Sequence, residues 1–137
     1  MSGHFSQNLH CDNVDGVEVI RCGCIAKISS QSLSLTYRRE LQNVMDEFQP
    51  DTVIFHYPNP FVSTLLEKYL KRDFKLILFW HLDITKQKIL GKLFHRQTLR
   101  LLERAEVVIP ASPNYIQGSM YLKRYEKNAV LFQIVFA

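Results

Sequence analysis

The sequence predicts an α/β fold in which helices cover a parallel, doubly wound, Rossmann-like sheet. Three observations favour this class. Short apolar segments alternate with longer segments of helical periodicity, the apolar segments are rich in β-branched and aromatic residues, and several stop abruptly at a polar residue. The 137 residues are enough to bury one core. We therefore expect a single α/β domain over residues 1–137, with residues 1–14 poorly ordered or covering a sheet edge.

The first part of the chain predicts one strand and one helix. Residues 17–22 alternate in polarity and contain β-branched side chains, as a strand does, and they follow a turn signal at residues 12–16. Residues 23–32 are predicted as a loop. Apolar residues then recur at helical spacing over residues 33–48, and Pro50 ends this predicted helix.

Two strands and the helix between them follow. Residues 52–56 form an apolar segment that ends at a histidine, and residues 61–70 are predicted as a helix after a loop stiffened by prolines. Within residues 75–80, KLILFW, the five residues after the lysine are bulky and apolar, and the chain turns polar immediately afterwards at residues 81–83, HLD. This pattern predicts a buried parallel strand that ends at the rim of the sheet.

The rest of the chain continues the alternation. We expect a long helix over residues 84–104, a strand over 106–111, a short helix over 113–121 with Ser112 as its cap, and a last strand over 129–135. Basic residues recur every fourth position of the long helix and would form a slowly winding stripe: Lys88, Lys92, Arg96, Arg100 and Arg104.

Polar side chains follow three of the predicted strands. Ligands of open α/β sheets bind at the carboxyl ends of the strands, so these residues are the candidate site. Together they would suit a polyhydroxylated or phosphorylated ligand, and a histidine there can donate or accept a proton near neutral pH. Taken singly, each of these residues could instead cap a helix or form part of a turn, without a role in binding. The candidates are His56 and Asn59, His81 and Asp83, and Ser112 and Asn114.

Composition and charge narrow the function classes. No apolar segment approaches the ~20 residues of a membrane span, and the N-terminus lacks the features of a secretory signal. Three cysteines indicate free thiols, and Cys22-Gly-Cys24 lacks the second pair that a metal site needs. Residues 1–60 carry 4 Lys/Arg against 7 Asp/Glu, whereas residues 61–137 carry 13 against 6. The basic half predicts an anionic partner.

Several well-known motifs are missing from the sequence. It contains no G-x-G-x-x-G after a strand, no G-x-x-x-x-G-K-[ST], no Asp-x-Asp pair and no G-x-S-x-G. We therefore predict no bound dinucleotide, no metal and no serine nucleophile. The basic half is the only feature that favours nucleic acid, and no motif supports it, so we predict no nucleic-acid partner.

Four segments, in this order, resemble one known family: DGVEVIRC (15–22), FHYPNP (55–60), FWHLDITKQK (79–88) and LLERAEVVIPASPNYIQGS (101–119). They resemble the N-terminal, acceptor-side domain of family 4 glycosyltransferases of the GT-B fold. The resemblance implies retaining transfer of a sugar from a nucleotide sugar to a glycan or lipid-linked acceptor in cell-surface polysaccharide biosynthesis, without a metal or other cofactor.

The resemblance also assigns roles to the candidate residues. It places His81 as the catalytic residue, with Asp83 and Lys86 beside it as substrate-binding residues. The remaining candidates match the acceptor-side rim of the family: His56, Asn59, Ser112 and Asn114.

The sequence departs from the family pattern at both ends. The first strand–helix unit and the C-terminal nucleotide-sugar domain, with its two glutamates separated by seven residues, have no counterpart here. We therefore expect a truncated, half-GT-B domain that is inactive alone and that self-associates through an exposed sheet edge.

A second class of function remains open. The chain would also serve as a non-catalytic α/β binding or scaffold module.

As an enzyme half, the chain is expected in the cytoplasm, peripheral to the inner face of the cell membrane, with the basic stripe against anionic lipid. The alternative for the stripe is a solvated helix face.

Overall fold

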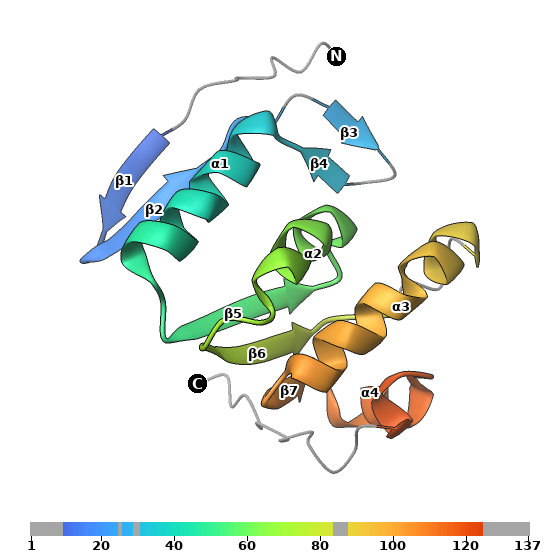
Figure 1. The fold of residues 1–137 in the computed structure, drawn as a ribbon. Helices are drawn as coiled ribbons and strands as arrows, with labels where there is room; N and C mark the ends of the chain where they lie inside the picture. The colour runs from blue at the N-terminus through green and yellow to red at the C-terminus, as the bar shows by residue number, and fades with distance from the viewer. Residues whose placement is uncertain (1–9, 25, 29–30, 84–87, 125–137) are drawn as a thin grey trace. The chain divides into compact units, whose positions relative to one another are not determined.

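The structure is a computed structural model that describes residues 10–24, 26–28, 31–83 and 88–124. The chain divides into two compact units, which we call the hairpin unit (up to Pro50) and the sheet unit (from Asp51). Figure 1 shows the elements of both, and each unit is described by itself. The predicted strand at 129–135 and the predicted start of the long helix at 84–87 lie outside the described residues.

The hairpin unit begins with two antiparallel strands, β1 (His10–Val14) and β2 (Val17–Arg21). The two residues between them have positive φ angles, 51° at Asp15 and 86° at Gly16, as a two-residue hairpin turn requires. A strand at 17–22 was predicted correctly, but its place in a parallel sheet was wrong, because its partner is the adjacent segment. The Asp-Gly signal closes a local hairpin instead of starting a crossover.

A second hairpin occupies part of the segment that was predicted as a loop. Strands β3 (Ala26–Ile28) and β4 (Gln31–Leu33) pair antiparallel, so the loop prediction over 23–32 was wrong for these residues. This segment is rich in serine, which is not typical of strands. The two strands pair through backbone groups, which any residue supplies, so the side chains did not indicate the pairing.

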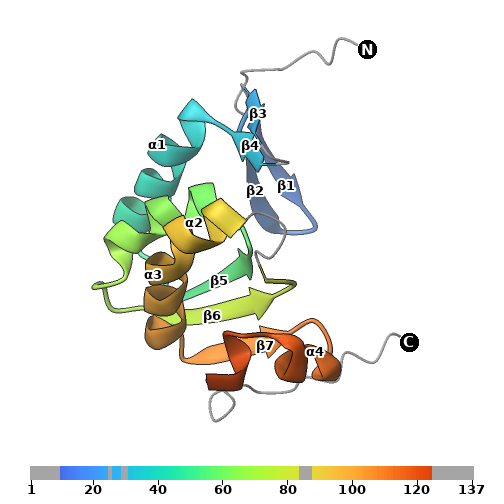
Figure 2. The same ribbon diagram turned by 90° about the vertical axis from the view of Figure 1, so that its right-hand side faces the viewer.

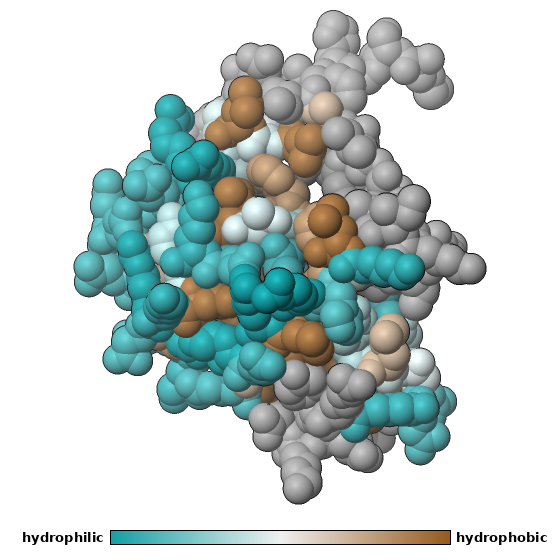
Figure 3. Space-filling view, turned by 45° about the vertical axis from the view of Figure 1, so that its right-hand side comes forward, coloured by the Kyte–Doolittle hydropathy of each residue, from teal (hydrophilic) through white to brown (hydrophobic). Residues whose placement is uncertain are grey.

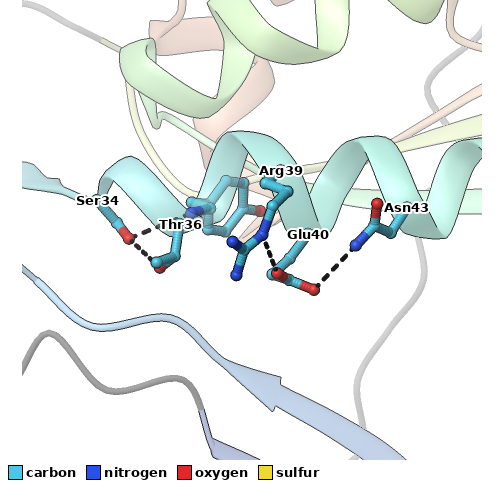
Figure 4. Close-up of polar contacts among 6 residues, drawn as sticks. Ser34, Thr36, Arg39, Glu40 and Asn43 are labelled. Carbon is cyan, nitrogen blue, oxygen red and sulfur yellow. Dashed lines mark hydrogen bonds and ion pairs between the residues drawn. The ribbon is translucent and has the colours of Figure 1, made fainter.

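Helix α1 (Leu35–Asn43) continues through a wider helical turn, Val44–Phe48, and confirms the predicted helix. The Ser34 hydroxyl accepts a hydrogen bond from the backbone N–H of Tyr37 at 3.3 Å, so Ser34 caps the helix. Figure 4 shows this cap and the polar contacts of Glu40 along the helix. Glu40 accepts hydrogen bonds from Arg39 (3.0 Å) and Asn43 (3.4 Å).

The sheet unit contains a parallel sheet of three strands in the order β5-β6-β7. Its strands are β5 (Thr52–Tyr57), β6 (Lys75–Trp80) and β7 (Val107–Pro110). Helix α2 (Pro60–Leu66), extended by a short turn over Glu67–Tyr69, joins β5 to β6, and α3 (Lys88–Arg104) precedes β7. The predicted α/β class with a parallel sheet is confirmed.

Helices α2 and α3 cover the same face of this sheet (Figure 2). The strand order is sequential, so two right-handed crossovers place both helices on one side. Gln97 on α3 donates a hydrogen bond to Thr64 on α2 at 3.0 Å, and Arg100 forms an ion pair with Glu67. The covered face holds the core, whereas Ile54 on the opposite face is 60% exposed. The fully buried side chains of the core include Tyr57, Leu76, Leu78, Trp80, Leu101, Leu102 and Val108.

Arg104 ties the last turn of α3 to the segment before β6. Its guanidinium donates to the backbone carbonyls of Leu70 (2.8 Å), Arg72 (3.0 Å) and Phe74 (2.5 Å). The guanidinium also lies 5.0 Å from the centroid of the Phe74 ring. Arg104 and Arg100 of the predicted basic stripe therefore bind groups of the protein itself.

The sheet unit ends with α4 (Pro113–Gly118) and a helical turn at Leu122–Arg124, so the predicted helix over 113–121 is shorter than expected. Tyr121 packs against Trp80, and its hydroxyl lies 3.1 Å from Nδ1 of His95 on α3. None of the helices in the described ranges combines the length and the hydropathy that crossing a membrane requires. On the face shown in Figure 3, hydrophobic residues reach the surface between hydrophilic ones.

Candidate functional site

The candidate site lies at the carboxyl edge of the parallel sheet. Tyr57, Trp80 and Pro110 are register partners, so the three strands end side by side. The pairing extends one residue further. The backbone N–H of His81 donates to the Tyr57 carbonyl at 3.0 Å, and the backbone N–H of Ala111 donates to the Trp80 carbonyl at 2.8 Å. The chain segments that carry His56, His81 and Ser112 therefore leave the sheet at the same edge, as the parallel pattern predicts.

His56 and His81 are in direct contact at this edge. Nδ1 of His56 lies 2.9 Å from Nε2 of His81, and both side chains are exposed to solvent. The ring planes differ by 18° and the ring centroids are 5.2 Å apart, so the two nitrogens lie between the rings and face each other. Phe79 packs beside both rings, at 5.2 Å from His56 and 4.9 Å from His81. The sequence placed these histidines at one edge but did not predict their contact.

Two features of the site disfavour a positive charge on His81, partial burial first and the neighbouring histidine second. Partial burial of the ring lowers the pKa of His81 below its usual value, and the neighbouring His56 lowers it further. His81 is therefore mainly neutral near pH 7. A neutral imidazole carries one N–H donor and one nitrogen acceptor, which suits it to bind a hydroxyl group.

Asp83 is buried instead of facing the edge. Its side chain is 5% exposed, and Oδ1 accepts a hydrogen bond from the indole Nε1 of Trp80 at 2.8 Å. The Ser119 hydroxyl contacts both carboxylate oxygens at 2.8 and 2.9 Å. The backbone N–H of Asp83 donates to the Tyr115 hydroxyl at 3.2 Å. The carboxylate thus joins the end of β6 to α4 and the residues after it, and its substrate-binding role stays a prediction.

Sequence reasoning missed the partners of Asp83. Ser119 and Tyr115 lie more than thirty residues further along the chain and have no local signal that links them to it. A signal did exist for Trp80. A buried indole N–H needs an acceptor, and a carboxylate three residues later in the W-H-L-D segment is within reach of a turn.

The other predicted site residues have different surroundings. Asn59 caps α2, because its Oδ1 accepts a hydrogen bond from the backbone N–H of Val62 at 3.2 Å. Ser112 and Asn114 are exposed. Ser112 takes the cap position of α4 through its carbonyl, which accepts from Tyr115 N–H at 3.1 Å, and not through the hydroxyl that was predicted to cap. Lys86 lies outside the described residues.

The described residues contain no group of three or more His, Cys, Asp or Glu side chains arranged to hold a metal ion. Cys11, Cys22 and Cys24 are free thiols in the hairpin unit. Burial raises the pKa of the Cys22 thiol, so it is mainly protonated at neutral pH.

Comparison with known proteins identifies a family. The sequence model described as Glycosyltransferase Family 4 matches residues 4–117 of this chain. The O-antigen chain mannosyltransferase C of Escherichia coli is 30% identical over 105 residues, which are 77% of this chain and 28% of that protein. The D-rhamnosyltransferase WbpZ of Pseudomonas aeruginosa is 29% identical over 106 residues, which are 77% of this chain and 27% of that protein. The chain thus spans less than a third of either relative, and no solved structure matches it significantly.

Proposed function

The chain belongs to glycosyltransferase family 4, and from this premise we propose that it forms the acceptor-side half of a retaining glycosyltransferase. The complete enzyme would transfer a sugar from a nucleotide sugar to a glycan or lipid-linked acceptor during the synthesis of a cell-surface polysaccharide. The observation that carries the proposal is the exposed pair His56–His81 at the carboxyl edge of the sheet. This edge is where open α/β sheets bind their ligands.

His81 would act on the transferred sugar. A neutral imidazole in a fixed position can hydrogen-bond a sugar hydroxyl or the charge that develops as the bond to the nucleotide breaks. Such a contact accelerates the reaction to the extent that it is stronger in the transition state than in the ground state. Its contact with His56 leaves Nδ1 as the ring nitrogen of His81 that is available to the substrate.

The donor sugar is proposed from the relatives. Their names refer to mannose and rhamnose, so nucleotide sugars that carry these two sugars are the donors to test first. The nucleotide would be bound by a part of the enzyme that has no counterpart in these 137 residues, and we expect no transfer by this chain alone. Ser112 and Asn114, exposed at the same edge, would contact the acceptor, with Asn59 close to it as a cap.

We also infer peripheral contact with the inner face of the cell membrane. Lys92 and Arg96 on α3 are exposed, and Leu93 between them is 69% exposed. Basic and apolar side chains on one helix are what an anionic lipid surface binds. Arg100 and Arg104 are engaged within the protein, so the proposed contact is limited to the first half of the described stripe.

Self-association through a sheet edge is a further part of the proposal. Among the described residues, the outer edges of β5 and β7 have no strand partner. Unpaired edges favour strand addition by a second copy. Light scattering over a range of concentrations should show dimers or larger species, and a monomer at high concentration would contradict this part.

The transfer reaction can be tested in a fusion protein. This chain would replace the matching segment of the E. coli mannosyltransferase, and transfer would be measured with mannose and rhamnose donors. His81→Ala is expected to lower kcat/KM by about 10²–10³-fold, the usual effect of removing one transition-state hydrogen bond. His10→Ala, at an exposed histidine of β1, is the matched control and should have no effect.

Two outcomes would contradict the proposal. One is full activity in His81→Ala. The other is a fusion that folds, as judged by circular dichroism, and binds the nucleotide sugar but transfers nothing to any acceptor. The second outcome would favour the non-catalytic binding module.

A further inference from the structure

We propose that His56 and His81 form one proton-sharing unit, in which the tautomer of His56 sets the tautomer of His81 and the neutral pair offers a ligand one N–H donor and one nitrogen acceptor. His56 is then a positioning residue for His81. The nature of the ligand, a hydroxylated sugar, rests on the proposed function. The tautomer of the pair does not, because it follows from the contact between the two rings.

The contact between the rings requires a single bridging proton. Nδ1 of His56 and Nε2 of His81 are 2.9 Å apart and face each other. Two bare nitrogens would repel at this distance, and two N–H groups would clash, so one nitrogen donates and the other accepts. The hydrogen bond between the two facing nitrogens therefore couples the protonation of one ring to that of the other.

The bridging proton determines what the outer nitrogens can do. If His56 donates, Nδ1 of His81 carries the outer proton and Nε2 of His56 is the free acceptor. If His81 donates, Nδ1 of His81 is the acceptor and Nε2 of His56 carries the proton. One tautomer converts to the other when the bridging proton shifts, one outer nitrogen gains a proton and the other loses one. Both tautomers therefore present one donor and one acceptor, as two sugar hydroxyls require.

Uptake of one proton changes the chemistry of the pair. Both outer nitrogens then become donors while the bridging hydrogen bond remains, and the unit carries one positive charge. A second proton would put N–H groups on both facing nitrogens and break the contact. The lowered pKa of His81, caused by partial burial and then by His56, agrees with this resistance to double protonation. Phe79 beside the rings carries no charge that would alter it.

The test is nitrogen NMR of the histidine side chains in the 137-residue chain, with ¹⁵N-labelled histidine. In the parent protein at pH 7.5 the tautomers of the two rings should be complementary, with the bridging proton on Nδ1 of His56 or on Nε2 of His81 but never on both. In His56→Ala the tautomer ratio of His81 should change because Nε2 loses its partner ring, and the pKa of His81 should rise towards its usual value because the neighbouring ring is gone. In His56→Asn, whose amide can again donate to or accept from Nε2 of His81, the tautomer ratio should differ from that in His56→Ala. His10→Ala should leave the His81 signals unchanged.

The outcomes separate this inference from the proposed function. A His81 tautomer that is the same in the parent and in His56→Ala would overturn the inference, whatever the transfer assay shows. A tautomer that follows the inference, in a fusion protein without transfer activity, would overturn the proposed function alone. His56 is exposed, so both variants should fold, and circular dichroism checks this.

Discussion

The two units of the chain build their sheets in different ways. The hairpin unit pairs strands that are neighbours in the sequence, with a two-residue turn between β1 and β2. The sheet unit pairs parallel strands that are joined through α2 and α3. The large, fully buried side chains of the described residues all belong to the sheet unit. Burial of large apolar side chains therefore contributes more to the sheet unit, which carries the candidate site, than to the hairpin unit.

The largest expected difference between the units comes from truncating a core side chain. Leu78→Ala removes a fully buried side chain from the middle of the sheet and should cost about 2–5 kcal/mol of the free energy of unfolding. Val17→Ala changes a side chain that is 63% exposed and should cost less than about 0.5 kcal/mol. Urea unfolding measures both, with the fluorescence of Trp80, the single tryptophan, reporting on the sheet unit. Equal costs would contradict the comparison.

The buried carboxylate should give the next largest effect. Asp83→Ala leaves the Trp80 indole N–H and the Ser119 hydroxyl without their acceptor, and it should cost about 1–3 kcal/mol in urea unfolding. Asp73→Ala, the same change at an exposed site, should cost less than about 0.5 kcal/mol. If Asp83→Ala were as mild as Asp73→Ala, the carboxylate would not hold the end of β6.

Two glycines distinguish turn chemistry from packing. An added Cβ would meet nothing within 4 Å at either Gly16 or Gly118, but only Gly16 has a positive φ, 86°. Gly16→Ala should therefore destabilise the β1–β2 hairpin by about 1–2 kcal/mol, because the left-handed backbone disfavours a side chain. Gly118→Ala should be neutral or stabilise by up to about 1 kcal/mol. Amide hydrogen exchange in β1 and β2 measures the first effect. Faster exchange in β6 as well would show that the two units are coupled.

Charge reversal tests whether lipid contact belongs to the sheet unit. Arg96→Glu on α3 and Arg38→Glu on α1 change the net charge equally, and both arginines are exposed. A basic residue near an anionic surface contributes about 1 kcal/mol, so Arg96→Glu should weaken binding to phosphatidylserine vesicles by roughly tenfold in a sedimentation assay. Arg38→Glu should change binding much less. Equal losses would indicate an unspecific effect of net charge.

The smallest expected effect is a pH dependence of the sheet unit. The pKa of His81 is lower in the folded chain than in the unfolded chain, so the unfolded chain binds more protons between the two pKa values. The contribution of His81 to the free energy of unfolding is complete above the pKa of the unfolded chain, about 6.5. It is lost as the pH falls through the lower pKa of the folded chain. Urea unfolding at a series of pH values should show a shallower loss in His56→Ala. An equally steep loss of the free energy of unfolding in His56→Ala would show that His56 does not contribute to the lowered pKa of His81.

The sequence predicted the sheet unit better than the hairpin unit, for a physical reason. Strand β6 has the predicted bounds, because five consecutive bulky apolar residues between a lysine and a polar segment have few alternatives to a buried strand. Strand β1, HCDNV, has no apolar alternation, and its pairing depends on the turn after it. A turn signal was recognised there, but its two-residue length, which selects a hairpin, was not used.

The candidate site was predicted in its position but not in its contacts. Parallel pairing places strand ends at one edge, so His56 and His81 could be assigned to that edge from their order in the sequence alone. Their 2.9 Å contact and the burial of Asp83 depend on side-chain orientation and on Ser119, which lies 36 residues further along the chain. Such contacts between distant residues have no periodic signal in one sequence.

The guanidinium of Arg104 links the far end of the sheet to the histidines. By binding the carbonyls of Leu70, Arg72 and Phe74, it anchors the residues at which β6 begins. Strand β6 is extended and has a fixed length per residue, so fixing its first residue also restricts the position of His81, which follows its last residue. A lysine could not replace this arginine, since a single ammonium lacks the planar fork that spans several acceptors. We therefore expect the position of His81 to depend on Arg104, a residue of α3 that lies at the opposite end of β6.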